Sequence, residues 1–192
     1  MVDDKTLSLV KKAGGQHIAV GVEVGNQRIR DLIKKGNSVD DVRNCANLIK
    51  KNGLRMVAFT MVGLPWEGKD EIEDTVNLVR EIDPYIVYPY MPTPAAGTEL
   101  AEIMGKKNPH GLETFRDICH INPKADISER MGPEEREGVL EWAMSEFVKI
   151  NRRSLVRDIF SRPGFYYALA NDMAFFHKPS LLFSYVKDYM SS

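Results

Sequence analysis

The chain has 192 residues, with 26 Lys and Arg against 27 Asp and Glu, so its formal net charge is −1. A near-neutral balance offers no broad basic surface, and we therefore expect no nucleic-acid partner. The two cysteines, Cys45 and Cys119, are too few for a disulfide framework and favour a reducing, cytoplasmic location. The sequence lacks a run of about 18 apolar residues, so it predicts no membrane span.

The hydrophobic pattern alternates between helical and strand periods over the first half of the chain. Helices are expected to begin at polar N-caps (Asp3 or Asp4, Asn26 and Ser38), and glycines stop them. The ranges expected, in order, are helix 4–13, strand 16–25, helix 27–35, helix 39–52, strand 54–62, helix 71–82 and strand 85–91. This alternation predicts right-handed crossovers and a parallel α/β sheet.

The second half has a different pattern. Residues 106–130 show no sustained period and predict a long irregular connection. A long helix is expected from Pro133 to the break at Arg162-Pro163-Gly164, with a buried stripe of Leu140, Ala143, Phe147 and Ile150. Two short helices are expected to finish the chain. We therefore divide it into an α/β domain over residues 1–105 and a helical extension over 106–192.

The first strand has two unlike faces. Its alternation places Ile18, Val20 and Val22 on one face and His17, Ala19, Gly21 and Glu23 on the other. A parallel strand in a closed core is normally apolar on both faces, whereas the second face here is small and then acidic. Glu23 lies at the carboxyl end of the strand, where ligands gather in parallel α/β sheets and barrels. The pattern predicts a cavity lining that ends in a carboxylate.

Three motifs follow one another in a familiar order. They are Gly-Val-Glu-x-Gly at residues 21–25, Ala-Phe-Thr-Met-Val-Gly-Leu-Pro-x-Glu at 58–67, and Thr-Pro-x-x-Gly-Thr-Glu-Leu at 93–100. In this order and spacing, residues 3–104 resemble the C-terminal half of a radical S-adenosylmethionine (radical SAM) domain. The resemblance is closest to members that carry a separate cobalamin-binding domain upstream. It implies a partial, TIM-barrel-like (β/α) barrel with helices on its outside, followed by a helical extension.

The same resemblance implies the cofactors. Radical SAM proteins hold a [4Fe-4S] cluster on a Cys-x-x-x-Cys-x-x-Cys loop in the first half of the barrel, and this chain has no such triad. The resemblance therefore implies S-adenosylmethionine, a cluster whose ligands are not in this chain, and cobalamin as a further cofactor of a full-length protein. It also implies a small-molecule substrate. On this interpretation the chain is truncated, split or degenerate, and inactive alone; no catalytic or metal-binding residue is assigned to it.

The site residues follow from the resemblance, position by position. Glu23 matches a polar residue that faces the ribose or amino group of S-adenosylmethionine. Gly63 and Leu64 match the strand-end turn that approaches the adenine, and Pro92 and Thr93 match the next strand end. The expected partner is the N-terminal half of the barrel, in the same or a separate chain, or a second copy, because three strands leave two sheet edges exposed.

Simpler interpretations stay open at this stage. The chain is alternatively a non-catalytic scaffold or interaction subunit that keeps the half-barrel, or an unrelated α/β enzyme. Glu67 is expected to favour the N-terminus of the helix that follows it. Tyr85, Tyr88 and Tyr90 suit either a substrate channel or packing. The group of His110, Asp117, Cys119 and His120 matches no standard metal spacing.

Overall fold

The structure is a computed structural model, and it describes residues 2–92, 97–107 and 128–161. The chain divides into two compact units, residues 1–150 and 151–192, and each is considered by itself. The domain boundary expected near residue 105 stays a prediction, because residues 108–127 lie outside the described part.

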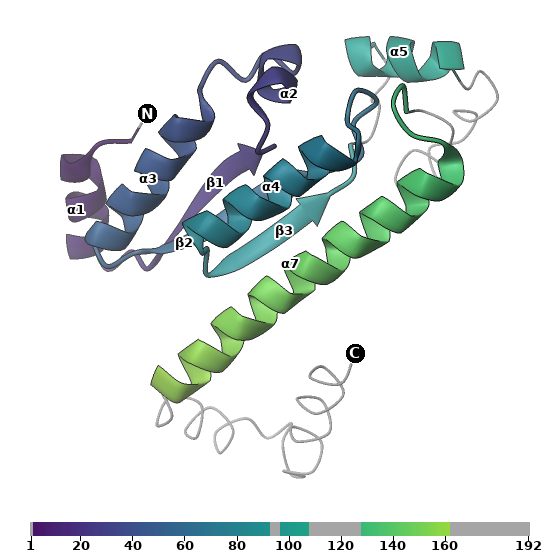
Figure 1. Ribbon diagram of the computed structural model, residues 1–192. Helices are drawn as coiled ribbons and strands as arrows, with labels where there is room; N and C mark the ends of the chain where they lie inside the picture. Colours follow the sequence, from purple (N-terminus) through teal and green to yellow (C-terminus); the bar gives the residue numbers. More distant parts are fainter. Residues whose placement is uncertain (1, 93–96, 108–127, 162–192) are drawn as a thin grey trace. The chain divides into compact units, whose positions relative to one another are not determined.

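The first unit alternates helices and strands as the sequence predicts. Figure 1 shows three parallel strands with helices packed against them, and a long helix in the C-terminal region. In chain order the elements are α1 (Asp4–Lys12), β1 (His17–Glu23), α2 (Gln27–Leu32), α3 (Val39–Lys51), β2 (Arg55–Met61), α4 (Lys69–Ile82), β3 (Ile86–Tyr90), α5 (Glu99–Lys107) and α7 (Pro133–Ser161). The expected α/β class with a helical C-terminal region is confirmed.

The helix starts are fixed by the polar side chains that the sequence indicates. The Asp3 carboxylate accepts from the Thr6 N–H at 2.7 Å, so Asp3 rather than Asp4 is the N-cap of α1. Ser38 and Asp41 form a reciprocal capping box at α3, with N–H to oxygen distances of 3.1 and 2.8 Å. Such caps satisfy backbone donors that a helix start leaves unpaired.

The sheet has the order β1–β2–β3, and both neighbouring pairs are parallel. The register pairs Gly21 with Phe59 and Phe59 with Tyr88, so these three residues form one row across the strands. The ladder between β1 and β2 shifts between Gly21 and Glu23, which marks a bulge at the end of β1.

One face of the sheet forms the hydrophobic core, and the other is partly exposed. Alternate strand residues pack with α1, α3, α4 and the first half of α7 in a single cluster, as Met56, Leu7, Ile49, Val76 and Leu140 illustrate. Figure 1 shows α3 and α4 over the same face of the sheet. On the opposite face the side chains include His17, Ala19, Arg55, Phe59, Tyr88 and Tyr90. We call these residues, with Gly21, Glu23 and Met61, the open face.

The long helix belongs to this core over its first half. Leu140, Ala143, Phe147 and Ile150, the stripe expected from the sequence, are all buried. Helix α5 is a correction, because the sequence pattern assigned no helix to residues 99–107. The helix after β2 also begins two residues earlier than expected, at Lys69. The irregular connection through residue 127 and the two terminal helices lie outside the described residues.

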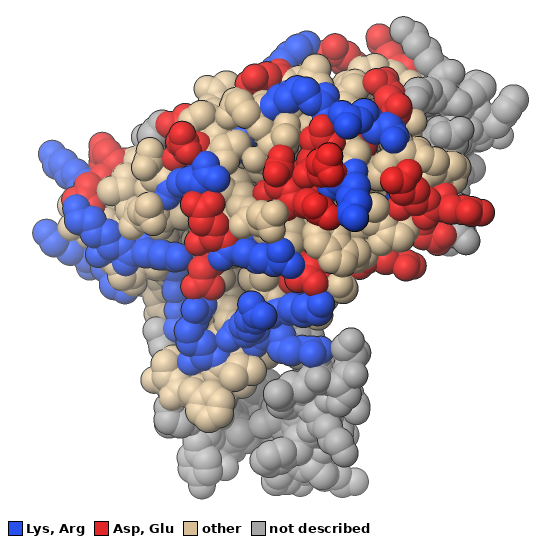
Figure 2. All heavy atoms as spheres, in the orientation of Figure 1, with Lys and Arg blue, Asp and Glu red and all other residues tan. Residues whose placement is uncertain are grey.

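Charged side chains of both signs share the surface. Figure 2 shows Lys and Arg interspersed with Asp and Glu on the face in view. Several of them are paired, for example Arg43 with Glu81 at 2.9 Å. The helices described in the structure include none that is both long and apolar enough to cross a membrane.

Candidate functional site

The chain turns sharply where β2 ends. Gly63 adopts a φ of 91°, a left-handed conformation that glycine reaches without a steric penalty. The N–H groups of Gly63 and Leu64 both donate to the Glu67 carboxylate, at 2.7 and 2.8 Å. The Glu67 side chain, at the end of this turn, therefore holds the backbone at its beginning.

Glu67 is fully buried, which the sequence-based interpretation as a helix-start carboxylate did not foresee. Its Oε2 accepts both turn N–H groups, whereas its Oε1 is buried and has no hydrogen-bond partner among the described residues. Burial raises the pKa of Glu67 from 4.5 to about 7, against the lowering effect of the two backbone donors. The expectation for Glu67 is corrected, because its carboxylate holds the turn after β2 and does not cap α4.

A buried arginine approaches the same turn from α7. The Nη2 of Arg136 donates to the Gly63 carbonyl at 3.1 Å, and Arg136 is 1% exposed. A Cβ on Gly63 would stand 3.0 Å from that nitrogen and 3.3 Å from Leu140. Gly63 therefore faces the long helix, and the close approach of α7 favours a glycine at this position.

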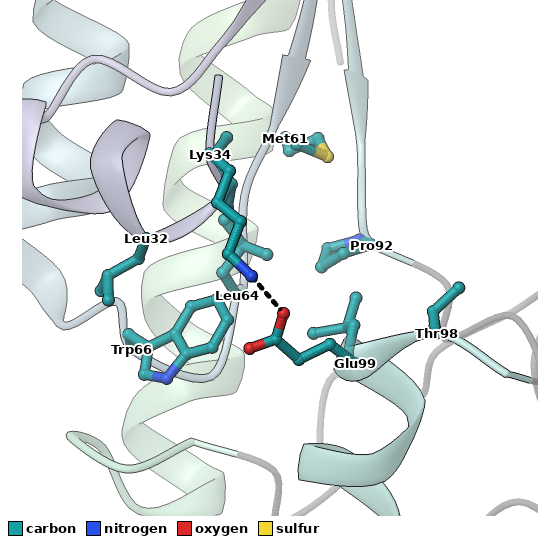
Figure 3. A pocket seen from close by; sticks show the side chains of 10 residues that line it. Leu32, Lys34, Met61, Leu64, Trp66, Pro92, Thr98 and Glu99 are labelled. Atoms are coloured by element: carbon teal, nitrogen blue, oxygen red, sulfur yellow. Dashed lines mark hydrogen bonds and ion pairs between the residues drawn. The ribbon is translucent and has the colours of Figure 1, made fainter. Parts of the chain in front are cut away.

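Beside the turn lies a cavity of about 290 Å³. Figure 3 shows the side chains around it, which come from α2, the ends of β2 and β3, and the start of α5. Its walls are mostly apolar, and its lining residues are Leu32, Ile33, Lys34, Met61, Leu64, Trp66, Pro92, Thr98, Glu99 and Leu100. Cavities at the carboxyl ends of parallel strands are the usual ligand sites of such folds.

An ion pair lies beside this cavity. Lys34 Nζ lies 2.7 Å from Glu99 Oε2, and Figure 3 marks this contact with a dashed line. The hydrogen bond from Lys34 holds the pKa of Glu99 below its ordinary value. Both side chains are more than two-thirds exposed, so their contribution to stability is small. The pair links the turn after α2 to α5, and it places a cation and an anion at the cavity.

Trp66 is held by contacts with neighbouring helices. Arg28 donates to the Trp66 carbonyl at 3.1 Å and to Glu71 on α4 at 2.6 Å. Leu64, Val24 and Ile29 form a small buried cluster against which Trp66 packs. The Trp66 indole is partly exposed and forms part of the cavity wall, and the contacts above hold its turn in place.

Glu23 lies on the open face, at the end of β1. Its φ is 61°, and its carboxylate accepts from Lys35 Nζ at 2.6 Å. The carboxylate folds back over Gly21, where an added Cβ would stand 2.6 Å from Glu23 Oε1. Gly21 thus leaves room for the pair of Glu23 with Lys35.

The five predicted site residues have different positions. Leu64 and Pro92 line the cavity, whereas Glu23 and Gly63 do not belong to its lining. Thr93 lies outside the described residues. The assignment of these five residues to a cofactor stays a prediction.

Most of the aromatic side chains singled out in the sequence pack against one another or against an arginine. Phe59 stacks on Tyr88 and Tyr90, with ring centroids 5.6 and 6.0 Å apart, and both tyrosines are well exposed. Tyr85 stands under Arg55, which is 4.4 Å from the ring centroid. The segment with His110 and Cys119 lies outside the described residues, and the described part holds no group of three or more potential metal ligands.

Sequence reasoning missed the two adjacent lysines and Trp66. Lys34 adopts a φ of 56°, so the chain bends after α2. Lys34 then pairs with Glu99 at the cavity, whereas Lys35 pairs with Glu23 on the open face. The Lys-Lys-Gly sequence after a helical stripe signals a helix end, but it does not indicate two separate acidic partners.

Comparison with known proteins gives this site a context. Residues 1–79 match the family model described as the radical SAM superfamily. The chain is 30% identical over 105 residues to the anaerobic magnesium-protoporphyrin IX monomethyl ester cyclase of Rubrivivax gelatinosus, a match that covers 55% of this chain and 19% of that protein. It is also 30% identical over 146 residues to the tRNA-2-methylthio-N(6)-dimethylallyladenosine synthase of Halalkalibacterium halodurans, covering 72% of this chain and 26% of that protein.

A solved structure was also matched. The radical S-adenosylmethionine methyltransferase TsrM from Kitasatospora setae, with cobalamin and a [4Fe-4S] cluster bound, has a TM-score of 0.47 and 17% identity, over 72% of this chain and 28% of that one. The chain spans about a fifth to a quarter of the length of the two curated relatives above.

Proposed function

We propose that this chain, whose residues 1–79 belong to the radical SAM superfamily, forms one side of an S-adenosylmethionine pocket. The observation that carries the proposal is the cavity at the carboxyl ends of β2 and β3, because Leu64 and Pro92 line it. Both residues stand at motif positions that, by the family resemblance, approach adenine.

The lining suits the nucleoside part of the cofactor. Trp66, Leu64 and Pro92 offer flat or apolar surface to a purine, and stacking on an aromatic ring favours any base. On the open face, the Glu23 carboxylate is an acceptor suited to a ribose hydroxyl or an ammonium group. When bound together with a cluster, S-adenosylmethionine would supply the radical chemistry of the family.

The residues of this chain do not fit the cluster itself. A [4Fe-4S] cluster is held by several cysteine thiolates, whereas this sequence has two cysteines. Cys45 lies on α3, where burial raises the pKa of its thiol and disfavours a thiolate ligand. We therefore propose that residues outside this chain hold the cluster. We extend the proposal to cobalamin only as a group bound by a separate domain of a longer protein.

The open face supports a further part of the proposal, namely a partner that covers the sheet. Tyr88 and Tyr90 are 44% and 53% exposed on a face that a closed barrel would enclose. We propose that the N-terminal half of the barrel, in the same or a separate chain, lies against this face. Where that half is absent, we propose that a second copy of this chain covers the open face instead.

The pocket can be tested on the 192-residue chain without a cluster. We expect 5′-methylthioadenosine, titrated to millimolar concentration, to shift the NMR signals of Leu64 and of the Trp66 indole. Leu32→Glu places a carboxylate in the cavity wall and should weaken binding about tenfold, or about 1.4 kcal/mol. Leu9→Glu is the matched control, because Leu9 is an exposed leucine on α1. Shifts confined to other parts of the chain, or equal effects of the two variants, would refute the pocket.

The enzyme proposal needs a second experiment. The chain would be co-expressed with an N-terminal radical SAM half that carries the three-cysteine loop, and the complex reconstituted anaerobically with iron and sulfide. We expect a brown complex that cleaves added S-adenosylmethionine to methionine and 5′-deoxyadenosine, with dithionite as the electron donor. A stable complex that binds the nucleoside but never yields 5′-deoxyadenosine would instead favour the scaffold function. A failure to form any complex would exclude both.

A further inference from the structure

The end of β1 contains an unfavourable backbone conformation. Glu23 adopts a φ of 61°, in the left-handed region that residues with a Cβ rarely occupy. Such a conformation is energetically unfavourable, and it persists only where its surroundings impose it. The contact with Lys35 involves only the side chain of Glu23.

Arg30 supplies the missing constraint. It stands on α2, is fully buried, and its Nη1 donates to the Val22 carbonyl at 2.6 Å and to the Val24 carbonyl at 2.9 Å. These are the two carbonyls that flank Glu23. The Nε of Arg30 donates to the Asn37 carbonyl at 3.1 Å, and Nη2 donates to the Asn37 side chain. The guanidinium is thus anchored on its other side by the loop before α3.

The distances from Arg30 Nη1 to the two carbonyl oxygens show how this contact constrains the backbone at Glu23. Two oxygens at 2.6 and 2.9 Å from one nitrogen lie no farther apart than the sum of these distances. In an extended strand, carbonyls two residues apart are separated by roughly 6.6 Å. One nitrogen therefore holds both carbonyls only if the backbone contracts at Glu23, and the left-handed conformation provides that contraction.

The charge environment agrees with this geometry. Burial lowers the pKa of Arg30, whereas the nearby carboxylates of Glu23, Asp41 and Asp31 counteract the effect. A buried guanidinium remains charged, and its hydrogen bonds to carbonyls are stronger than neutral ones. Arg30 can therefore offset the backbone cost at Glu23.

We infer that Arg30 is the positioning residue for Glu23: it pins the two flanking carbonyls, fixes the bulge at the end of β1, and so aims the Glu23 carboxylate across Gly21 toward Lys35. The value of this arrangement for S-adenosylmethionine binding rests on the proposed function. The positioning itself does not, because it concerns contacts within this chain.

The test reads the conformation of residue 23 directly, without a ligand. NMR of the 192-residue chain gives the amide coupling and the Cα and Cβ shifts of Glu23. Arg30→Met should remove the left-handed signature at Glu23 in a protein that is still folded. Arg136→Met, the control, removes another buried guanidinium and should leave that signature unchanged. A folded Arg30→Met protein with an unchanged Glu23 conformation would overturn the inference.

Loss of folding in Arg30→Met is covered by a second variant. Glycine adopts the left-handed conformation freely, so Glu23→Gly/Arg30→Met should regain a cooperative unfolding transition. A double variant as unfolded as Arg30→Met would mean that Arg30 acts only as a core residue, and it would reject the positioning role. If wild type fails to bind methylthioadenosine while the conformational result holds, the proposed function falls and the role of Arg30 stands.

Discussion

The guanidinium of Arg136 donates to the carbonyl of Gly63 at 3.1 Å, although 73 residues separate them in sequence. From the other side of the same turn, the Glu67 carboxylate accepts the N–H groups of Gly63 and Leu64. The turn that carries Leu64 into the cavity wall is thus held by one buried carboxyl group and one buried guanidinium. Its geometry depends on the docking of α7.

Glu67 should make the stability of the protein depend on pH. Its pKa is 4.5 in an ordinary environment and about 7 when buried here, so between these values the folded state binds more protons than the unfolded state. The free energy of unfolding therefore falls as pH rises from 4.5 to 7, by about 3 kcal/mol for this group. Glu67→Gln should remove that dependence and should be more stable than wild type at pH 8. Urea unfolding at pH 5 and pH 8 measures it.

A matched control separates this effect from general changes in charge. Glu141→Gln removes a carboxylate from an exposed position on α7 and should keep the wild-type pH profile. If Glu67→Gln and wild type lose stability in parallel from pH 5 to pH 8, the buried carboxylate is not the source of the dependence.

Arg136 should affect the titration of Glu67 as well as the turn after β2. Its charge lowers the pKa of Glu67, so Arg136→Met should shift the upper end of the pH-dependent window above 7. Removal of one member of a buried charge arrangement typically costs about 3 kcal/mol, because the other charge is left uncompensated. In the Glu67→Gln background the loss should be smaller, and a double-mutant cycle measures the difference. Additive losses would show that the two residues act independently.

Gly63 offers a test of how closely α7 approaches the turn. Gly63→Ala combines a left-handed backbone with a Cβ 3.0 Å from Arg136 and 3.3 Å from Leu140. Gly14→Ala has a similar φ of 89° and open space around the Cβ, so it isolates the backbone cost of about 1 kcal/mol. We expect Gly63→Ala to exceed this control by about 1–2 kcal/mol of overpacking in chemical denaturation. Equal losses of stability in the two variants would mean that α7 moves away from the added methyl group at little cost.

Local signals explain why so much of the fold could be predicted. Caps such as Asp3 and Ser38 act through bonds three residues away, and the stripe of Leu140 and Phe147 repeats at the helical period, so both can be recognised within a short window. The unequal faces of the first strand likewise follow from its own alternation. These features need no knowledge of distant contacts.

The parts of the site that escaped prediction depend on such contacts. Glu67 looks like a helix-start carboxylate in sequence, and its burial becomes visible only when α7 packs over the turn. Arg30 falls among polar residues of a short helix, yet it is buried by the end of β1 and by Asn37. Helix α5 has a weak apolar stripe, and its first residues contribute to the cavity opposite α2. Long-range packing overrides local pattern at all three places.

The open face yields the last prediction, which concerns association. Phe59, Tyr88 and Tyr90 present stacked aromatic surface, and at 44% and 53% exposure the two tyrosines retain much surface to bury against a partner. We expect the chain alone to self-associate at high concentration in sedimentation equilibrium, since β1 and β3 also leave two sheet edges unpaired within the described sheet. Tyr90→Glu should weaken this association about tenfold while leaving the unfolding free energy within about 0.5 kcal/mol of wild type. Leu9→Glu, on the exposed side of α1, should not weaken the self-association. A monomer at every concentration, or an equal effect of the two variants on association, would show that the open face does not drive assembly.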